Sequence, residues 1–318
     1  MFDRIEIPTP FQVGPVNCYV ADSTVIDPGP DSDDAWATLE EELHAIGTSI
    51  NEIERVLITH PHPDHFGLAS RLRDHGATIV AREMAAGIIE DFPGRLSYEQ
   101  SYFVPFFIRH GLREDLVSTM VELPEAFLEF APSTTVDRRV SDGESIDIGQ
   151  ATVQAETVQG HAPGELIFTY ETANGEVAIV GDHVLDPITP NPFLQPPPSP
   201  DEQRPRVLPA YNDSLDRLAD RAFDRLLPGH RDVIDRPTHR IEQLRRFHEH
   251  RTDRTEAEVT EPRTAAQVMR GLFGDLPVTE IFSGMSEAIG HLDVLETRGR
   301  VKMEESADTV RFVAVDAQ

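Results

Sequence analysis

The chain has 318 residues, of which 39% are hydrophobic and 26% charged, as expected for a folded protein with one large domain and a smaller one. No run of about 18 apolar residues occurs, and residues 1–10 lack the basic start and apolar block of a secretion signal, so we expect a cytoplasmic protein that does not enter a membrane. The single cysteine, Cys18, excludes an internal disulfide and a cysteine-rich metal site.

The formal charge of −28 is unusual, and Lys302 is the only lysine, so arginine supplies nearly all the positive charge. The acidic residues are dispersed along the chain and form no long tail. This pattern favours a halophilic protein, because salt screens the self-repulsion that would loosen such a fold. A basic protein partner is the alternative explanation.

Apolar runs and helical patterns alternate in the first part of the chain. We expect strands at 16–20, 24–26, 55–59 and 78–81, and helices at 34–46 and 68–75. This alternation predicts an α/β fold. Residues 83–130 interrupt it with many aromatic residues and predict a mostly helical insertion, which could be a lid over the site or an additional packing layer.

Strand patterns return at 138–147, 152–158, 166–170 and 177–180, with a hairpin turn at Asn174-Gly175. Residues 189–209 are rich in proline and should be irregular, and 214–227 has the pattern of an amphipathic helix. Helices at 238–254, 264–273 and 279–297, followed by a hairpin at 301–303 and 310–315, suggest a winged-helix module. From Arg236 on, 12 basic and 15 acidic residues give a net charge of −3, which leaves −25 for the rest. We therefore predict a catalytic domain at 1–235 and a C-terminal domain at 236–318.

The densest histidine cluster follows the expected strand at 55–59. It reads His60-Pro61-His62-Pro63-Asp64-His65, and the two prolines argue against a helix there. Neutral imidazole and carboxylate are the ligands that zinc and similar divalent ions prefer. His161, Asp182 and His230 each follow a glycine at the end of an apolar element, where the chain can turn sharply. These residues predict a metal site.

The motif His60-x-His62-x-Asp64-His65, followed in order by His161, Asp182 and His230, resembles the metallo-β-lactamase-fold hydrolase superfamily over residues 5–235. Asn17-Cys18-Tyr19 and Asp27-Pro28-Gly29 are also similar to it. The resemblance implies an αββα sandwich with two divalent ions at one sheet edge. Zinc is the expected metal, and manganese and iron are the alternatives. It implies that one ion is held by His60, His62 and His161, the other by Asp64, His65 and His230, with Asp182 as a bridge.

The segments around Gly181-Asp182-His183 and Phe247-His248-Glu249-His250-Arg251 resemble the branch of that family with a C-terminal winged-helix domain, which includes β-lactamase-like and hydroxyacylglutathione-hydrolase-like proteins. Arg231 stands after His230, where members commonly have glycine. His183 could support the metal centre from behind or be structural, and Tyr211 is expected in the core.

The resemblance implies a hydrolase in which a hydroxide shared by the two metals attacks a thioester or related acyl substrate. Asp64 and Asp182 are the catalytic candidates: Asp64 would orient the nucleophile and protonate the leaving group, and Asp182 would hold the metals at working distance. The expected partner is a small acyl molecule, with a homodimer as the candidate assembly.

Two other functions stay open. A phosphodiesterase acting on single-stranded RNA would use the cluster Arg236, Arg240, Arg245 and Arg246, although these arginines could instead pair with Glu242 and Glu249 on the same helix. From another class, the chain could be a non-hydrolytic metal-binding protein or a winged-helix regulator.

The charge yields a first prediction. Between 0.05 M and 2 M KCl, the thermal unfolding midpoint should rise, because screening removes repulsion among carboxylates that a net charge of −28 leaves uncompensated. Differential scanning calorimetry at constant zinc concentration would measure it. A midpoint that falls, or that does not change, would contradict salt adaptation.

Overall fold

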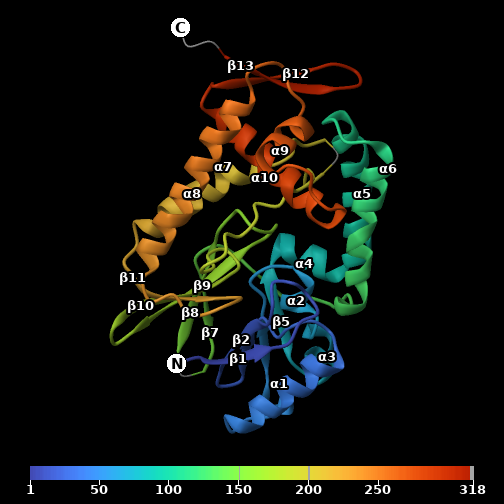
Figure 1. Ribbon diagram of the computed structural model, residues 1–318. Helices are drawn as coiled ribbons and strands as arrows, with labels where there is room; N and C mark the ends of the chain where they lie inside the picture. Colours follow the sequence, from blue (N-terminus) through green and yellow to red (C-terminus); the bar gives the residue numbers. More distant parts are fainter. Residues whose placement is uncertain (150, 200, 316–318) are drawn as a thin grey trace. The chain divides into compact units, whose positions relative to one another are not determined.

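The computed structural model describes residues 1–149, 151–199 and 201–315 (Figure 1). The chain divides into two compact units. The first comprises Met1–Arg95, Ala126–Pro190 and Leu218–Arg240, and the second Leu96–Glu125, Asn191–Arg217 and Ile241–Gln318. The final three residues of the predicted 236–318 domain, and residue 200 in the proline-rich segment, lie outside the described residues.

The first unit contains two sheets. One has six strands in sequence order: β1 (Asp3–Ile7), β2 (Val16–Ala21), β3 (Thr24–Ile26), β4 (Arg55–Leu57), β5 (Thr78–Arg82) and β6 (Arg138–Val140). The other has the order β11-β10-β9-β8-β7, with β7 (Glu144–Asp147), β8 (Thr152–Thr157), β9 (Leu166–Thr172), β10 (Gly175–Gly181) and β11 (Phe223–Pro228). In the first sheet β3 to β6 run parallel, whereas in the second only β10 and β11 do.

Alternating side chains of the first sheet enter two different cores, because successive residues of a strand point to opposite faces. Cys18, Val56 and Ile79 face a core that they share with α1, α3 and α4. Tyr19 and Leu57 face the other core, whose remaining members include buried residues of the second sheet. The two sheets therefore pack face to face, and both faces of the first sheet are covered, which explains its continuous apolar runs.

The helices follow in chain order: α1 (Asp33–Ala45), η1 (Ile50–Glu52), α2 (Pro63–Phe66), α3 (Ala69–Asp74), α4 (Glu83–Glu90), α5 (Phe92–Arg109), α6 (Glu114–Glu122), η2 (Leu123–Phe130), α7 (Val207–Ala219), α8 (Pro237–Glu258), α9 (Ala265–Phe273) and α10 (Val278–Thr297). None of the helices among the described residues is long and apolar enough to cross a bilayer.

The second unit has its own core, in which Phe103 and Phe107 of α5 pack with residues of α9 and α10. The ring of Phe103 lies 5.2 Å from that of Phe282. The region 83–130 is helical as predicted, and these phenylalanines are packing residues of the second unit. Its two-stranded sheet joins β12 (Val301–Glu305) to β13 (Val310–Ala314), so the expected helices and hairpin are present. The winged-helix assignment stays a prediction.

Three local predictions were wrong. The segment 214–227 is not one helix: α7 ends at Ala219, and β11 begins at Phe223 because its apolar residues complete the second sheet beside β10. The segment 138–147 is two strands, β6 and β7, which belong to different sheets. Pro63 begins the short helix α2 instead of preventing it, because proline at the first helical position needs no hydrogen-bond partner.

Candidate metal centre

The seven side chains predicted as metal ligands come together at one edge of the first unit. His60 follows β4, Asp182 follows β10 and His230 follows β11, and His161 lies in the connection between β8 and β9. Backbone hydrogen bonds join the two sheets there, from Leu166 N to Thr59 O at 2.8 Å and from Asn17 N to Gly229 O at 2.6 Å. The ligand candidates thus project from ends of strands that are tied to each other.

Two of the glycines noted in the sequence are required by close approach. Gly181 has a φ of +48°, and a Cβ there would lie 2.6 Å from Thr59 Oγ1. A Cβ on Gly229 would collide with Asp182 Oδ1 and His65 Cε1. A larger residue at position 229 would fill the space that two candidate ligands occupy, and one at position 181 would collide with Thr59.

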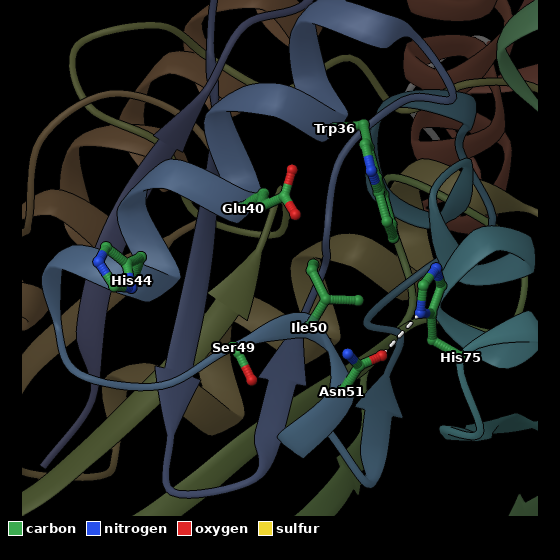
Figure 2. Close-up of a pocket in the computed structure, with 7 residues that line it drawn as sticks. All are labelled: Trp36, Glu40, His44, Ser49, Ile50, Asn51 and His75. Carbon is green, nitrogen blue, oxygen red and sulfur yellow. Dashed lines mark hydrogen bonds between the residues drawn. The ribbon is translucent and has the colours of Figure 1, made fainter.

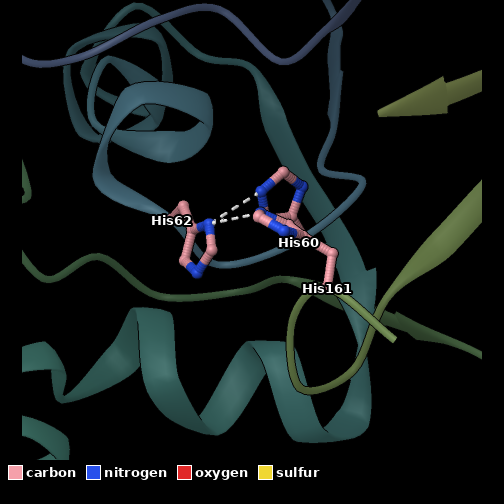
Figure 3. A group of neighbouring side chains, drawn as sticks. All are labelled: His60, His62 and His161. Carbon is pink, nitrogen blue, oxygen red and sulfur yellow. Dashed lines mark hydrogen bonds between the residues drawn. The ribbon is translucent and has the colours of Figure 1, made fainter. Parts of the chain in front are cut away.

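The first group consists of three histidines (Figure 3). His62 Nδ1 lies 3.1 Å from His60 Nε2 and 3.1 Å from His161 Nε2, so three ring nitrogens converge on one point. No carboxylate belongs to this group. Burial, together with the neighbouring imidazoles, holds the pKa of His60 well below its usual range and lowers the pKa of His62 to about 3. These two rings are therefore neutral and can act as ligands at physiological pH.

The second group consists of Asp64, His65 and His230, with His230 Nε2 at 3.3 Å from Asp64 Oδ2. Burial lowers the pKa of His65, but the carboxylates of Asp182, Asp27 and Asp64 outweigh it and raise the pKa well above its usual range. The pKa of His230 is raised in the same way, against burial, by Asp182 and Asp64.

Asp182 lies between the two groups. Its Oδ2 is 3.7 Å from His161 Nε2 and 3.6 Å from His230 Nε2, and its Oδ1 is 3.6 Å from His65 Nε2. Burial alone would raise the pKa of Asp182, but His230 and His65 hold it well below its usual range, so the carboxylate is ionised. One carboxylate therefore faces both sets of ligands.

The donor atoms fit divalent cations. Three of them, His65 Nε2, Asp182 Oδ1 and His230 Nε2, are buried without a hydrogen-bond partner among the described residues. Such atoms are costly to bury unless something else satisfies them. Imidazole nitrogens and carboxylate oxygens in sets of three are the arrangement that zinc and similar metals bind. The site is therefore suited to divalent metal binding.

Asp27, which the sequence indicated only as part of a turn, orients two of these ligands. It is buried, with Oδ1 accepting from Thr59 N at 2.8 Å and Oδ2 accepting from Thr59 Oγ1 at 2.6 Å and from His65 Nδ1 at 2.9 Å. Asp27 also lies close enough to His60 and His65 to form a third candidate set of metal ligands. Because both of its oxygens already accept hydrogen bonds, we assign Asp27 to orienting the ligands and not to binding the metal.

These bonds fix which ring nitrogen faces the centre. The Thr59 hydroxyl gives its one proton to Asp27, so His60 Nδ1, at 3.0 Å, donates to Thr59 Oγ1 and leaves Nε2 with its lone pair toward His62. His230 Nδ1 likewise donates to Pro15 O at 2.7 Å. The backbone and Asp27 thus fix which nitrogen of each ring is hydrogen-bonded to the protein and which faces the centre.

Glu165 is a second supporting residue that the sequence did not indicate. It is 1% exposed, and its Oε2 accepts from the backbone N–H of His161 at 3.2 Å and lies 3.3 Å from His183 Nδ1. His183 directly follows Asp182, so this buried pair links the loop of His161 to the loop of Asp182. Nothing in the sequence near Glu165 distinguishes it from a surface glutamate.

A cavity of about 300 Å³ in the same unit is unrelated to the metal centre (Figure 2). Its wall includes Trp36, Glu40, His44 and His75, and the ring of His75 contacts Asn51 Oδ1 at 2.9 Å. Within the part of the chain that the structure describes, no set of three converging ligand atoms includes these residues.

Asp27→Asn should reduce zinc affinity about 10- to 100-fold, the usual effect of losing a group that orients a ligand. The amide nitrogen of the new side chain at position 27 would face a donor of Thr59 or His65, so repulsion between two donors would replace one hydrogen bond. Competition with a chromophoric chelator would measure the affinity. Asp22→Asn is the matched control, because Asp22 also has a positive φ but lies in the turn between β2 and β3. Equal losses in both variants would contradict the role of Asp27.

Glu165→Ala should also weaken zinc binding, by about tenfold or more, because the loops of His161 and Asp182 lose their shared anchor. Glu165→Gln should keep most of the affinity, since its amide oxygen can still accept from His161 N–H. Glu171→Ala is the control, because Glu171 is exposed on β9, the strand that begins directly after Glu165. Circular dichroism would confirm folding, and wild-type zinc affinity in Glu165→Ala would refute the assignment.

The geometry agrees with comparisons to known proteins. A curated relative, the probable metallo-hydrolase YqjP of Bacillus subtilis (strain 168), is 29% identical over 97% of this chain and 96% of its own length. Two solved structures have the same fold, each with a TM-score of 0.81 over 99% of this chain. They are a metallo-beta-lactamase family protein from Thermus thermophilus, 24% identical with 98% of its chain covered, and a beta-lactamase domain protein from Burkholderia ambifaria, 25% identical with 91% covered.

The family model of the metallo-beta-lactamase superfamily matches residues 11–230. This match begins between β1 and β2, spans β2 to β11 and ends on His230, so it contains all seven converging side chains. The chain is a metal-dependent hydrolase that belongs to the metallo-beta-lactamase superfamily.

Proposed function

We propose that this protein hydrolyses a thioester or related acyl compound with two zinc ions, one held by His60, His62 and His161 and the other by Asp64, His65 and His230. The position of Asp182 is the observation that carries the proposal. Its Oδ2 is almost equidistant from His161 and His230, at 3.7 and 3.6 Å, so this one carboxylate could serve both sets of ligands.

When bound, the two ions polarise the acyl oxygen and lower the pKa of water, which is why hydrolysis needs no serine or cysteine nucleophile. The one cysteine agrees with this, because Cys18 is fully buried in β2 and burial raises the pKa of its thiol. The C–O bond to water forms while the C–S bond of the thioester breaks.

Asp64 is the group that we assign to proton transfer. Its carboxylate lies at the centre, 3.3 Å from His230 Nε2, and the residue is 8% exposed, so it reaches the ligands and still contacts solvent. It would take the proton from the attacking water and give it to the departing thiolate. The pKa of Asp64 is held below its usual range, against burial, by His65 and His230, so the carboxylate begins in the accepting form.

Three of the four arginines on which an RNA phosphodiesterase would depend already have partners, and the fourth, Arg236, is exposed. Arg240 is buried and donates to Leu185 O at 2.6 Å and Ile188 O at 2.7 Å, which fixes the chain after Asp182. Arg245 pairs with Asp216 at 3.0 Å and Arg246 with Glu242 at 3.6 Å. Their charges are therefore largely compensated, which favours a small acyl substrate over a polyanion.

A substrate panel tests the proposal. Purified protein with added zinc or manganese, in high salt, should hydrolyse thioesters faster than lactones, phosphodiesters, a β-lactam or single-stranded RNA. His62→Ala should lose metal and activity together while its circular dichroism spectrum is kept, because one of three converging nitrogens is removed. His44→Ala is the control in the unrelated cavity.

Two outcomes would count against this function. Full thioester hydrolysis by metal-free His62→Ala would sink the metal mechanism. Cleavage of RNA, but of no thioester, by the metal-loaded wild type would replace the acyl substrate with a phosphodiester.

A further inference from the structure

Among the residues that the structure describes, three other than glycine have a left-handed backbone: Asp22, Asp27 and Arg231, with φ of 47°, 53° and 70°. Aspartate tolerates this conformation better than most residues. The side chain of Asp27 also has an evident role, because it accepts hydrogen bonds from Thr59 and His65. Arginine has no such tolerance. A strained backbone that persists beside a functional site is a reason to ask what the residue does.

The turn itself is explained by the metal centre. Arg231 directly follows His230, and its carbonyl oxygen accepts from Asn17 Nδ2 at 2.8 Å and from Arg4 Nη1 at 3.2 Å. With the bond from His230 Nδ1 to Pro15 O, these contacts fix the backbone around His230. Glycine would make the same turn without strain. The ligand position therefore accounts for the turn but not for an arginine side chain.

The guanidinium of Arg231 is a cation without a charged partner among the described residues. In residues 1–149, 151–199 and 201–315 its guanidinium has no hydrogen bond or ion pair, although the chain has 56 acidic residues. Asp232, the next residue, faces Arg4 at 3.9 Å instead. Arg231 is exposed, and its Nη1 lies 3.7 Å from the place where a Cβ of Gly14 would be. Gly14 belongs to the loop between β1 and β2, which ends at Pro15 beside His230.

We propose that Arg231 binds an anionic group of the substrate, a carboxylate or phosphate remote from the bond that breaks. This inference rests on the proposed acyl hydrolase and narrows its substrate to acids. A guanidinium presents paired donors that match such groups, and its charge does not depend on pH. In a protein with a net charge of −28, an anionic substrate needs a local cation to approach the centre.

Three matched thioesters test it: S-acetyl-3-mercaptopropionate, its methyl ester, and the corresponding phosphonate. The ratio of kcat/KM for an anionic thioester to that for the methyl ester should fall about 10- to 100-fold in Arg231→Gly, through KM, since hydrogen bonds to a charged group are lost. Arg231→Lys should keep part of the preference. Comparison of the two acids shows whether carboxylate or phosphate is favoured.

The fold supplies an independent readout. Arg231→Gly should raise the thermal midpoint, because glycine relieves the left-handed strain, so weaker binding cannot be attributed to unfolding. Arg236→Ala removes the same charge from an exposed arginine a few positions along the chain and should keep the wild-type ratio. An unchanged ratio in Arg231→Gly, or an equal fall in Arg236→Ala, would overturn the inference.

A separate binding experiment distinguishes failure of the proposed hydrolase function from failure of the anion site at Arg231. If the wild type hydrolyses no thioester, the proposed function fails, and calorimetry with glutarate decides the role of Arg231. Glutarate should bind the zinc-loaded wild type about tenfold more tightly than zinc-loaded Arg231→Gly, since the charged hydrogen bonds are lost. Equal affinity, or no binding to either protein, would refute an anion site at Arg231.

Discussion

The buried carboxylate of Asp27 is the interaction on which the metal centre depends. Its two oxygens accept three hydrogen bonds, from both donors of Thr59 and from His65. Because Thr59 lies between β4 and His60, the same carboxylate joins the end of β3 to the end of β4 and sets the orientation of two ligands. A charged group this deep would be costly without these donors, and with them it becomes the rigid support for the rest of the site.

The convergence of the candidate ligands was predictable from sequence because these residues share a local pattern. The cluster from His60 to His65 is dense, and Gly181 and Gly229 stand before Asp182 and His230 for a steric reason that the structure makes plain. The supports were not predictable to the same degree. Asp27 was hidden inside a turn signal, and Glu165 acts through a contact with His183 that sequence spacing does not encode.

The errors in secondary structure have the same origin. Amphipathic spacing at 214–227 fits a helix, and only pairing with β10 makes β11 a strand. Residues 138–147 were expected to be one strand, but a turn at Asp142-Gly143 divides them, and β6 and β7 enter different sheets. The local sequence determines which face of an element is apolar, whereas the pairing of one strand with another depends on the whole unit.

The distances along the chain have a consequence for how the protein assembles. His230 is held by Pro15, 215 residues away, and Asn17 bonds Pro228 O across 211 residues. Closing such loops costs entropy that only later contacts recover, so we expect this edge of the fold to form late. A metal ion that binds only the completed site would, by mass action, stabilise the folded chain over the unfolded one, so the metal supply would influence how much of the protein stays folded.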